Sequence, residues 1–332
     1  MKKTIKIDFV DFWPDFVKTD NYFINVLKKY YEVEISPEPD YVFCSYFSDK
    51  HFRYRDCVKI YYIGENLVPD FNLYDYALGF HHLKFEDRYL RLPHYVLYDD
   101  AIEPALHKHE HEDSYYLSRK KFCNRVVSNP DADGARERMF KALGHIAQVD
   151  SGGRYGNNVG GPVKDKLAFE REYRFTLAYE NSSTPGYVTE KIFQAFAGET
   201  VPVYWGDPGI AKEFNPEAFI NVMDYPDLKA AVKAVKAVWE DEERYLAMMK
   251  APCVLPGSLA AQCLAEDYTD AFLRNIFEQE KEKAYRRNMV YIGRSYQDKL
   301  ADAVRVRGAL DVIKKPLHLA HIRKAQRKSS RR

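Results

Sequence analysis

The sequence lacks the features of a disulfide scaffold, a structural zinc site or a membrane-spanning protein. Only five of its 332 residues are cysteines, their number is odd, and no two form a Cys-x-x-Cys pair. Neither a disulfide framework nor a zinc site is therefore predicted. The chain has no run of about 18 apolar residues, which argues against a transmembrane helix, and its amino terminus shows no signal-peptide pattern. These absences favour a cytoplasmic protein with reduced thiols.

A strong excess of charge is also missing, because the net charge is only +1. The balance hides a basic tail: residues 314–332 hold eight Lys or Arg and no acid, and the rest of the chain carries 42 basic against 49 acidic residues. An acidic body argues against a nucleic acid partner. Leu317, Leu319 and Ile322 are interleaved in the tail, which fits either peripheral contact with an anionic membrane or a solvated end.

Short apolar runs alternate with segments of helical periodicity along most of the chain. This order predicts an α/β fold with parallel sheets, and the length allows about two domains. The predicted architecture is GT-B, in which two Rossmann-like halves face a cleft and C-terminal helices follow. The predicted strands are 5–9, 33–35, 41–44, 58–63, 122–128, 175–179 and 201–205, and the predicted helices are 21–31, 135–146, 188–197, 228–239, 242–250 and 268–287. The polar residues 103–121 are predicted to form a loop or linker.

The most informative stretch is residues 175–206, FTLAYENSSTPGYVTEKIFQAFAGETVPVYWG. It predicts a strand, a polar loop, a helix and a second strand. Ligands of open α/β sheets bind at the carboxyl ends of strands, and a helix N-terminus attracts anions. The junction is therefore a candidate diphosphate site. An ordinary capped helix, with Glu190 and Lys191 solvated, is the alternative interpretation.

The same stretch resembles the donor-binding signature of glycosyltransferase family 10, the α-1,3/4-fucosyltransferases, and in particular their bacterial branch. The matching motifs run in a consistent order from about residue 5 to residue 290. They are Tyr62-Ile63-Gly64-Glu65-Asn66, residues 71–80, residues 87–93, residues 127–130, Glu180-Asn181, residues 187–191, residues 202–206 and residues 211–216.

The resemblance implies an inverting α-1,3-fucosyltransferase. Such an enzyme transfers L-fucose from GDP-β-L-fucose to the 3-hydroxyl of N-acetylglucosamine in N-acetyllactosamine-type acceptors, as in Lewis-type glycans. It also implies three parts of the chain. Residues 1–118 would bind the acceptor, residues 119–290 would bind GDP-fucose, and residues 291–332 would form a helical segment with the basic tail. Some bacterial relatives carry a heptad array before the tail, and this chain has none.

Six residues match positions to which the family assigns roles. Glu65 matches the proposed general base. Glu190 matches a glutamate that contacts the donor and supports positive charge on the fucose ring, and Lys191 matches a diphosphate-binding lysine. Arg154, in Ser-Gly-Gly-Arg, resembles the diphosphate arginine, although the spacing after it departs from the bacterial pattern. The donor-contact positions are completed by Asn181 and Tyr187.

No metal site and no required cofactor are expected, with manganese at most a non-essential stimulant. Asp131-Ala132-Asp133 has the Asp-x-Asp form of metal-dependent transferases, but its neighbours Asn129, Pro130 and Gly134 indicate a turn. The alternating His107, His109 and His111 lie in a charged stretch that is typical of a solvated loop.

Other functions remain open from the sequence. A GT-B enzyme with another nucleotide sugar, or with α-1,4 linkage, would share the motifs. A non-catalytic glycan-binding protein would share the fold, but the joint presence of Glu65, Glu190 and Lys191 argues against it.

Overall fold

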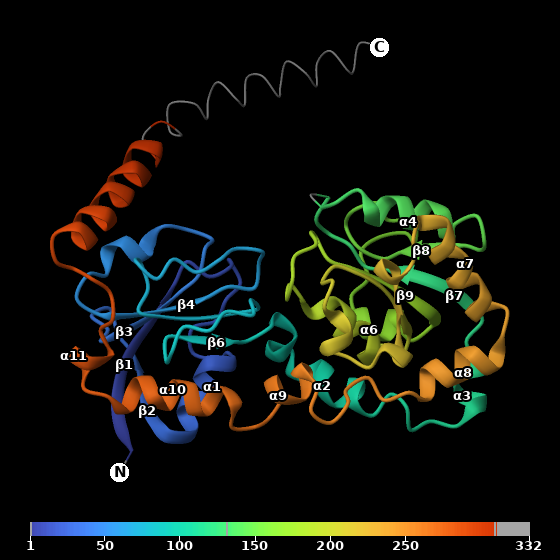
Figure 1. The fold of residues 1–332 in the computed structure, drawn as a ribbon, viewed down its shortest axis with the longest axis horizontal. Helices are drawn as coiled ribbons and strands as arrows, with labels where there is room; N and C mark the ends of the chain where they lie inside the picture. Colours follow the sequence, from blue (N-terminus) through green and yellow to red (C-terminus); the bar gives the residue numbers. More distant parts are fainter. Residues whose placement is uncertain (1, 131, 309, 311–332) are drawn as a thin grey trace. The chain divides into compact units, whose positions relative to one another are not determined.

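The computed structural model describes residues 2–130, 132–308 and 310 (Figure 1). These residues form two compact units. Unit 1 takes its residues from 1–62, 69–77 and 275–332, and unit 2 consists of 63–68 and 78–274. Each unit is built on a parallel sheet, as the alternation of strands and helices predicts.

The sheet of the amino-terminal half has the strand order β2-β1-β3-β4-β5-β6. Its first four strands belong to unit 1 and pair in parallel. In β1 the apolar side chains of Ile5, Ile7 and Phe9 are buried, which confirms the predicted strand, but Asp8 and Val10 are buried as well. The strands are β1 (Lys3–Val10), β2 (Tyr31–Ile35), β3 (Tyr41–Cys44), β4 (Val58–Tyr62), β5 (Tyr76–Gly79) and β6 (Tyr89–Arg91).

Aromatic rings dominate the core of unit 1. Phe9 of β1 stacks on Phe43 of β3 with ring centroids 5.0 Å apart, and Phe23 packs on Phe43 at 5.1 Å. Phe23 belongs to helix α1 (Tyr22–Tyr30), whose N-cap Asn21 accepts a hydrogen bond from the backbone N of Ile24. The helix therefore begins where an Asn caps its free N–H groups and buries its apolar side against the sheet.

The carboxyl-terminal segment returns to unit 1 and is held there by a buried ion pair. Arg287 Nε donates to Asp75 Oδ2 at 2.9 Å, and both side chains are completely buried. Arg287 also donates through Nη2 to the carbonyl of Cys57 at 2.6 Å. The segment comprises the end of α10 (Tyr268–Glu278), α11 (Lys281–Ala284) and a helix over residues 292–308, drawn in orange and red in Figure 1.

The sheet of unit 2 has the order β11-β10-β9-β7-β8, with all pairs parallel. Every residue of the central strand β9 is buried, as expected for a strand covered on both faces. The strands are β7 (Lys121–Arg125), β8 (Val149–Ser151), β9 (Tyr173–Tyr179), β10 (Val201–Trp205) and β11 (Ile220–Asn221).

Helices cover this sheet and leave its carboxyl edge to loops. Met139 and Leu143 of α4, Val235 of α7 and Met249 of α8 join one core with the strands. The helices are α4 (Ala135–Leu143), α5 (Lys166–Glu170), α6 (Glu190–Ala197), α7 (Leu228–Trp239), α8 (Glu242–Lys250) and α9 (Leu259–Cys263). The short 3-10 helices are η1 (Lys50–Arg53), η2 (His94–Leu97), η3 (Ile210–Lys212), η4 (Pro216–Ala218) and η5 (Val222–Asp224).

The prediction of a linker over residues 103–121 is wrong. Helix α2 (Asp99–Leu106) runs into it and helix α3 (Asp113–Leu117) lies within it. Lys108 is 1% exposed, with its Nζ donating to the carbonyls of Met248 and Met249 at 3.2 and 2.9 Å. Carbonyl groups of α8 satisfy this buried cation, and no sequence pattern encodes such a contact.

The predicted domain boundary after residue 118 falls inside unit 2. Tyr116 belongs to the core of the second sheet, and Arg119 pairs with Glu199 at 2.6 Å. Residues 78–118 are therefore part of the same compact unit as the strands that follow. The acceptor and donor roles given to the two halves stay predictions.

The membrane-related predictions concern the end of the chain. Among the described residues, no helix is long and apolar enough to cross a bilayer. The basic tail, residues 314–332, lies outside the described residues.

The Arg287–Asp75 pair gives a prediction for stability. Arg287→Met deprives the buried Asp75 carboxylate of its guanidinium partner, and breaking a buried pair costs about 3–5 kcal/mol. Urea unfolding should show this loss. Arg55→Met is the matched control, because Arg55 pairs with Asp298 while the two side chains are 50% and 41% exposed. Exposed pairs contribute about 1 kcal/mol or less, so equal losses in both variants would contradict the assignment.

Candidate donor and transfer site

The candidate site begins where β9 ends and α6 starts. Tyr179 closes the buried strand, and the loop from Glu180 to Thr189 leads to the first helical residue, Glu190. Thr189 occupies the N-cap position in extended backbone conformation. The junction combines the carboxyl edge of a parallel sheet with a helix N-terminus, which is the combination that receives phosphates.

Glu180 holds the start of α6 in place through hydrogen bonds. Its carboxylate is completely buried and accepts hydrogen bonds from Thr189 N at 2.8 Å, Thr189 Oγ1 at 2.6 Å and Lys191 Nζ at 3.1 Å. Burial raises the pKa of Glu180, while Lys191 and Thr189 act in the opposite direction. Glu180 therefore holds the loop to the helix rather than facing a ligand.

Lys191 is the cation at the start of α6. Its Nζ donates to Thr189 Oγ1 at 2.8 Å and lies 3.5 Å from Glu190 Oε1. Burial alone would lower the pKa of Lys191, but Glu180 and Glu190 outweigh it and raise the pKa. The two carboxylates therefore favour the charged ammonium and hold it in place.

Glu190 is ionised as well. Burial alone would raise its pKa, but Lys191, His94 and Lys166 outweigh that effect and hold the pKa at about 2. A depressed carboxylate pKa stabilises the fold above the ordinary value near 4.5, and this contribution is lost as the pH falls towards 2. At neutral pH the site thus contains a fixed anion beside a fixed cation.

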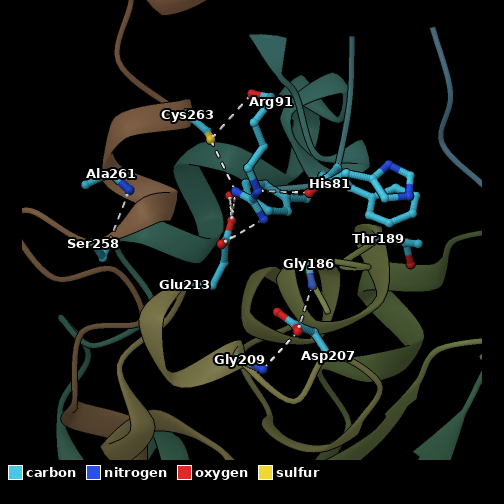
Figure 2. Close-up of polar contacts among 12 residues, drawn as sticks. His81, Arg91, Gly186, Thr189, Asp207, Gly209, Glu213, Ser258, Ala261 and Cys263 are labelled. Carbon is cyan, nitrogen blue, oxygen red and sulfur yellow. Dashed lines mark hydrogen bonds and ion pairs between the residues drawn. The ribbon is translucent and has the colours of Figure 1, made fainter. Parts of the chain in front are cut away.

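Tyr187 links this junction to Glu65. Its hydroxyl donates to Glu65 Oε2 at 3.1 Å across 122 residues of sequence, and its ring packs on Phe80 at 4.8 Å. The preceding Gly186 has φ +85, a conformation that favours glycine. Gly186 N donates to Asp207, which also accepts from Gly209 N (Figure 2).

A second contact fixes the segment that carries Glu65. Asn66 Nδ2 donates to Ser182 Oγ and to Thr184 Oγ1, each at 2.7 Å. Residues 63–68 therefore belong to the same compact unit as the β9–α6 loop. The structure brings Glu65, Tyr187, Glu190 and Lys191 together, although the sequence placed Glu65 in a different domain.

A buried ion pair between Arg91 and Glu213 lies next to Phe80. Arg91 donates to Glu213 through Nη1, and its Nη2 lies 3.0 Å from Glu213 Oε2 (Figure 2). Tyr95 OH also donates to Glu213. Arg91 Nε donates to the carbonyl of Phe80 at 3.0 Å, so the ion pair positions the residue on which Tyr187 packs.

His94 is a site residue that the sequence reasoning missed. A Cβ added to Gly64 would lie 2.8 Å from His94 Nδ1, so the ring rests on the backbone just before Glu65. Burial lowers the pKa of His94, while Glu190 acts to raise it. In the sequence His94 is a lone histidine after Pro93, and no pattern around it indicates a site residue.

Arg154 lies in the loop that follows β8, and its side chain is exposed. Backbone bonds from Gly152 N to Arg125 O and from Tyr155 N to Val127 O hold this loop beside the end of β7. Because β7 separates β8 from β9 in the sheet, Arg154 lies on the same edge as the β9–α6 loop, at a distance of two strand positions.

Arg136 is a second cation on this edge that the sequence reasoning missed. It lies in the first turn of α4 and is 3% exposed; its Nη2 donates to Asn129 O at 2.9 Å. Its Nε is buried, makes no hydrogen bond among the described residues and lies 3.8 Å from Glu137 Oε1. Burial lowers the pKa of Arg136.

Asn181 connects the two loops. Its carbonyl accepts a hydrogen bond from Asp133 N at 2.9 Å, which places the start of α4 beside the β9–α6 loop. The sequence pattern that could have pointed to Arg136 is the predicted strand, turn and helix from β7 to α4. This helix starts at the same sheet edge as α6.

The two metal-like motifs have structural roles. Asp133 Oδ1 accepts from Ala135 N at 2.7 Å at the start of α4, and Asp131 lies outside the described residues. His107 pairs with Glu103 and Glu110 on the surface. In the described part of the chain, no cluster of three or more His, Cys, Asp or Glu side chains could hold a metal ion.

Comparisons with known proteins find matches over both halves of the chain. Residues 7–98 match the model of the alpha-(1,3)-fucosyltransferase FucT N-terminal domain, and residues 116–250 match that of glycosyltransferase family 10 (fucosyltransferase) C-term. A crystal structure of an alpha1,3-fucosyltransferase superposes with a TM-score of 0.75 at 29% identity, covering 88% of this chain and 94% of that chain. A second, with GDP-fucose, gives 0.71 at 30% identity over 84% and 92%.

These matches define an α/β protein of the GT-B glycosyltransferase class and confirm the predicted fold. The chain belongs to glycosyltransferase family 10, the fucosyltransferases. It is 34% identical over 288 residues to the alpha-(1,3)-fucosyltransferase FucT of Helicobacter pylori, covering 74% of this chain and 59% of that protein. It is 30% identical over 179 residues to human 3-galactosyl-N-acetylglucosaminide 4-alpha-L-fucosyltransferase FUT3, covering 51% and 49%. The chain thus spans about half to three fifths of these relatives.

The Glu180 contacts predict a measurable loss on changing Thr189. Thr189→Val keeps the shape of the side chain but removes the hydroxyl that bonds Glu180 and Lys191. A buried group that loses its partner costs about 1–3 kcal/mol, which guanidinium unfolding would measure. The exposed Ser183 of the same loop provides the control, and Ser183→Ala should leave stability unchanged. A Thr189→Val protein as stable as the wild type would rule out this role for the hydroxyl.

Proposed function

We propose that this chain is an inverting α-1,3-fucosyltransferase that transfers L-fucose from GDP-β-L-fucose to the 3-hydroxyl of N-acetylglucosamine in N-acetyllactosamine-type glycans. The observation that carries the proposal is the hydrogen bond from Tyr187 to Glu65. It sets a carboxylate beside an anion-binding helix start. Membership of the fucosyltransferase family supports the choice of donor.

The residues have distinct roles in the proposed reaction. Glu65 accepts the proton of the acceptor hydroxyl while the hydroxyl oxygen bonds to C1 of fucose. The bond from C1 to the diphosphate oxygen breaks, and GDP leaves with the electron pair. Lys191 and the N-terminus of α6 stabilise the negative charge that develops on the diphosphate. The ionised Glu190 supports the positive charge on the sugar ring.

The fixed charges suit this chemistry without a resident metal ion. A diphosphate needs cations that stay charged, and Lys191 is held charged by two carboxylates. Arg136 lies in the first turn of α4, whose start is beside the β9–α6 loop, and its Nε lies 3.8 Å from Glu137 Oε1. We propose Arg136 as a diphosphate ligand alongside Lys191, with the exposed Arg154 as the alternative.

The choice of donor and the role of Glu65 can be tested together. The purified protein is incubated with a panel of nucleotide sugars, N-acetyllactosamine and EDTA, and nucleotide release and product mass are followed. We expect GDP release with GDP-fucose only and a deoxyhexose on the acceptor. Glu65→Gln should lower kcat by about 100-fold or more, as loss of a general base does, with GDP affinity retained.

Other outcomes would redirect the proposal. Transfer from another nucleotide sugar would keep the GT-B fold and reject the donor. Linkage analysis that shows 1,4 attachment would instead match the activity named for FUT3. A Glu65→Gln protein with wild-type turnover would show that Glu65 is not the base.

The two candidate arginines predict different losses of GDP affinity. Arg136→Ala removes a buried guanidinium and should weaken GDP binding by about tenfold or more, because charge-assisted hydrogen bonds contribute about 1.5–3 kcal/mol each. Arg154→Ala, at an exposed position, should change it by less than about threefold. Calorimetric titration with GDP measures both. The reverse order of effects would favour Arg154 as the ligand.

A further inference from the structure

His94 lies where the segment of Glu65 approaches α6, and the proposed reaction gives it no role. It is the first residue of the 3-10 helix η2. Its ring rests on the backbone of Gly64, because a Cβ added to that glycine would lie 2.8 Å from Nδ1 and 3.2 Å from Cε1 of the ring. Gly64 is followed directly by Glu65, and both belong to unit 2 together with η2 and α6. The whole argument therefore concerns one compact unit.

The short helix that carries His94 is anchored to α6. The Tyr95 ring stacks on Phe193 of α6 with ring centroids 5.2 Å apart, and it packs against Phe214 at 5.4 Å. The Tyr95 hydroxyl donates to the buried carboxylate of Glu213. Tyr95 is completely buried, and close packing holds such a side chain in one position. The backbone next to His94 is therefore fixed relative to α6.

The imidazole connects this fixed backbone to the segment of Glu65. Its Nε2 lies 3.4 Å from the Tyr98 hydroxyl, and the two rings meet edge to face with centroids 5.3 Å apart. Its Nδ1 side faces Gly64. Asn66 is held by its bonds to the β9–α6 loop. Glu65 is thus supported from the residue before it as well as from the residue after it.

Charged groups of two elements act on this imidazole. Glu190 and Lys191 belong to the start of α6, and Glu65 belongs to the segment on which the ring rests. Burial lowers the pKa of His94 and Lys191 acts in the same direction, while the two carboxylates act to raise it. The net shift is downward from the ordinary value of 6.5, so the imidazole is neutral at neutral pH.

A proton on His94 would add a positive charge to this cluster. A nearby cation makes a carboxylate a weaker base, and it attracts an anionic ligand. Protonation should therefore slow the removal of the acceptor proton by Glu65 and strengthen the binding of a diphosphate. The two effects have opposite signs for turnover and for donor binding. A side chain that only fills space would produce neither of them.

We propose that His94 is a positioning residue for the transfer reaction, whose neutral imidazole holds the Glu65 segment against α6 and keeps further positive charge away from Glu65 and Glu190. The proposal rests on the proposed function. His94 acts through these two carboxylates and needs no contact with the sugar or the nucleotide.

The positioning role predicts a loss of turnover without a loss of donor binding. His94→Ala removes the ring from Gly64 and should lower kcat by about tenfold or more while KM for GDP-fucose stays within about twofold, because a small misplacement of a catalytic group is costly. His94→Gln keeps a polar side chain that can bond Tyr98, and it should retain kcat within about threefold at alkaline pH. Steady-state kinetics with N-acetyllactosamine measure both. Wild-type kcat in His94→Ala would overturn the positioning role.

The pH profile tests the charge of the imidazole. In the wild type, the affinity for GDP-fucose without acceptor should rise by about threefold or more as the pH falls below 6.5, while kcat falls. GDP-fucose is the probe because both ends of its diphosphate are esterified, so the diphosphate does not titrate near neutral pH. His94→Gln should abolish the rise in affinity and move the fall of kcat to lower pH. A rise in affinity that His94→Gln leaves unchanged would overturn the proposal.

His145→Gln is the matched control. His145 is an exposed histidine of the same unit, and it follows α4, which begins beside the β9–α6 loop and runs for 9 residues before it. This variant should keep the pH profile of the wild type. If His145→Gln reproduced the effect of His94→Gln, the effect would reflect surface charge and the proposal would fail. Urea unfolding checks that each variant is folded, and His94→Gln decides the matter if His94→Ala is not.

An NMR titration of the histidine rings separates this proposal from the proposed function. The full chain is prepared with isotope-labelled histidine, and His94→Gln assigns the His94 signal. GDP should raise the pKa of His94, because binding linkage is reciprocal, and should leave the His145 signal unchanged. Glu190→Gln should lower the pKa of His94, because it removes a charge that acts to raise it. A His94 titration that neither change moves would overturn the proposal.

The two proposals can fail separately. If GDP does not bind, or if the wild type transfers no fucose, the proposed function fails. The effect of Glu190→Gln on the His94 titration still decides whether His94 belongs to the charge cluster. If transfer occurs and the His94 titration does not respond to Glu190→Gln or to GDP, the role of His94 fails while the proposed function stands.

Discussion

A buried carboxylate determines the geometry of the candidate donor site. Glu180 sits at the end of the central strand of unit 2 and binds both the backbone and the hydroxyl of Thr189. It also holds Lys191. A charge at this depth is tolerated only when its oxygens are fully hydrogen-bonded. The same requirement therefore fixes the loop, the helix start and the cation in one arrangement.

The surrounding charges are arranged in alternation. Lys191 stands between two carboxylates, and its raised pKa and the lowered pKa of Glu190 are two consequences of one cluster. Preorganised charges of this kind need little rearrangement when a charged ligand binds or reacts. Tyr187 then extends the cluster to Glu65, while the Arg91–Glu213 pair supports the packing beneath Tyr187.

Buried charged groups fix loops in both units. In unit 2, Arg136 donates to the carbonyl of Asn129, and the start of its helix bonds the carbonyl of Asn181. In unit 1, Asp11 uses its buried carboxylate to fix the loop of Lys50.

The sequence by itself determined the α/β class, most strands and helices, and the junction of β9 with α6, because these depend on local periodicity and on a motif of adjacent residues. It also contained the match for Glu65, Tyr187, Glu190 and Lys191. Only the tertiary structure decided that Glu65 meets Tyr187, that residues 103–121 are partly helical and belong to unit 2, and that Arg136 is buried beside the β9–α6 loop. Such facts depend on contacts between residues far apart in the chain, where a buried polar group is identified by its partner and no periodic pattern records that partner.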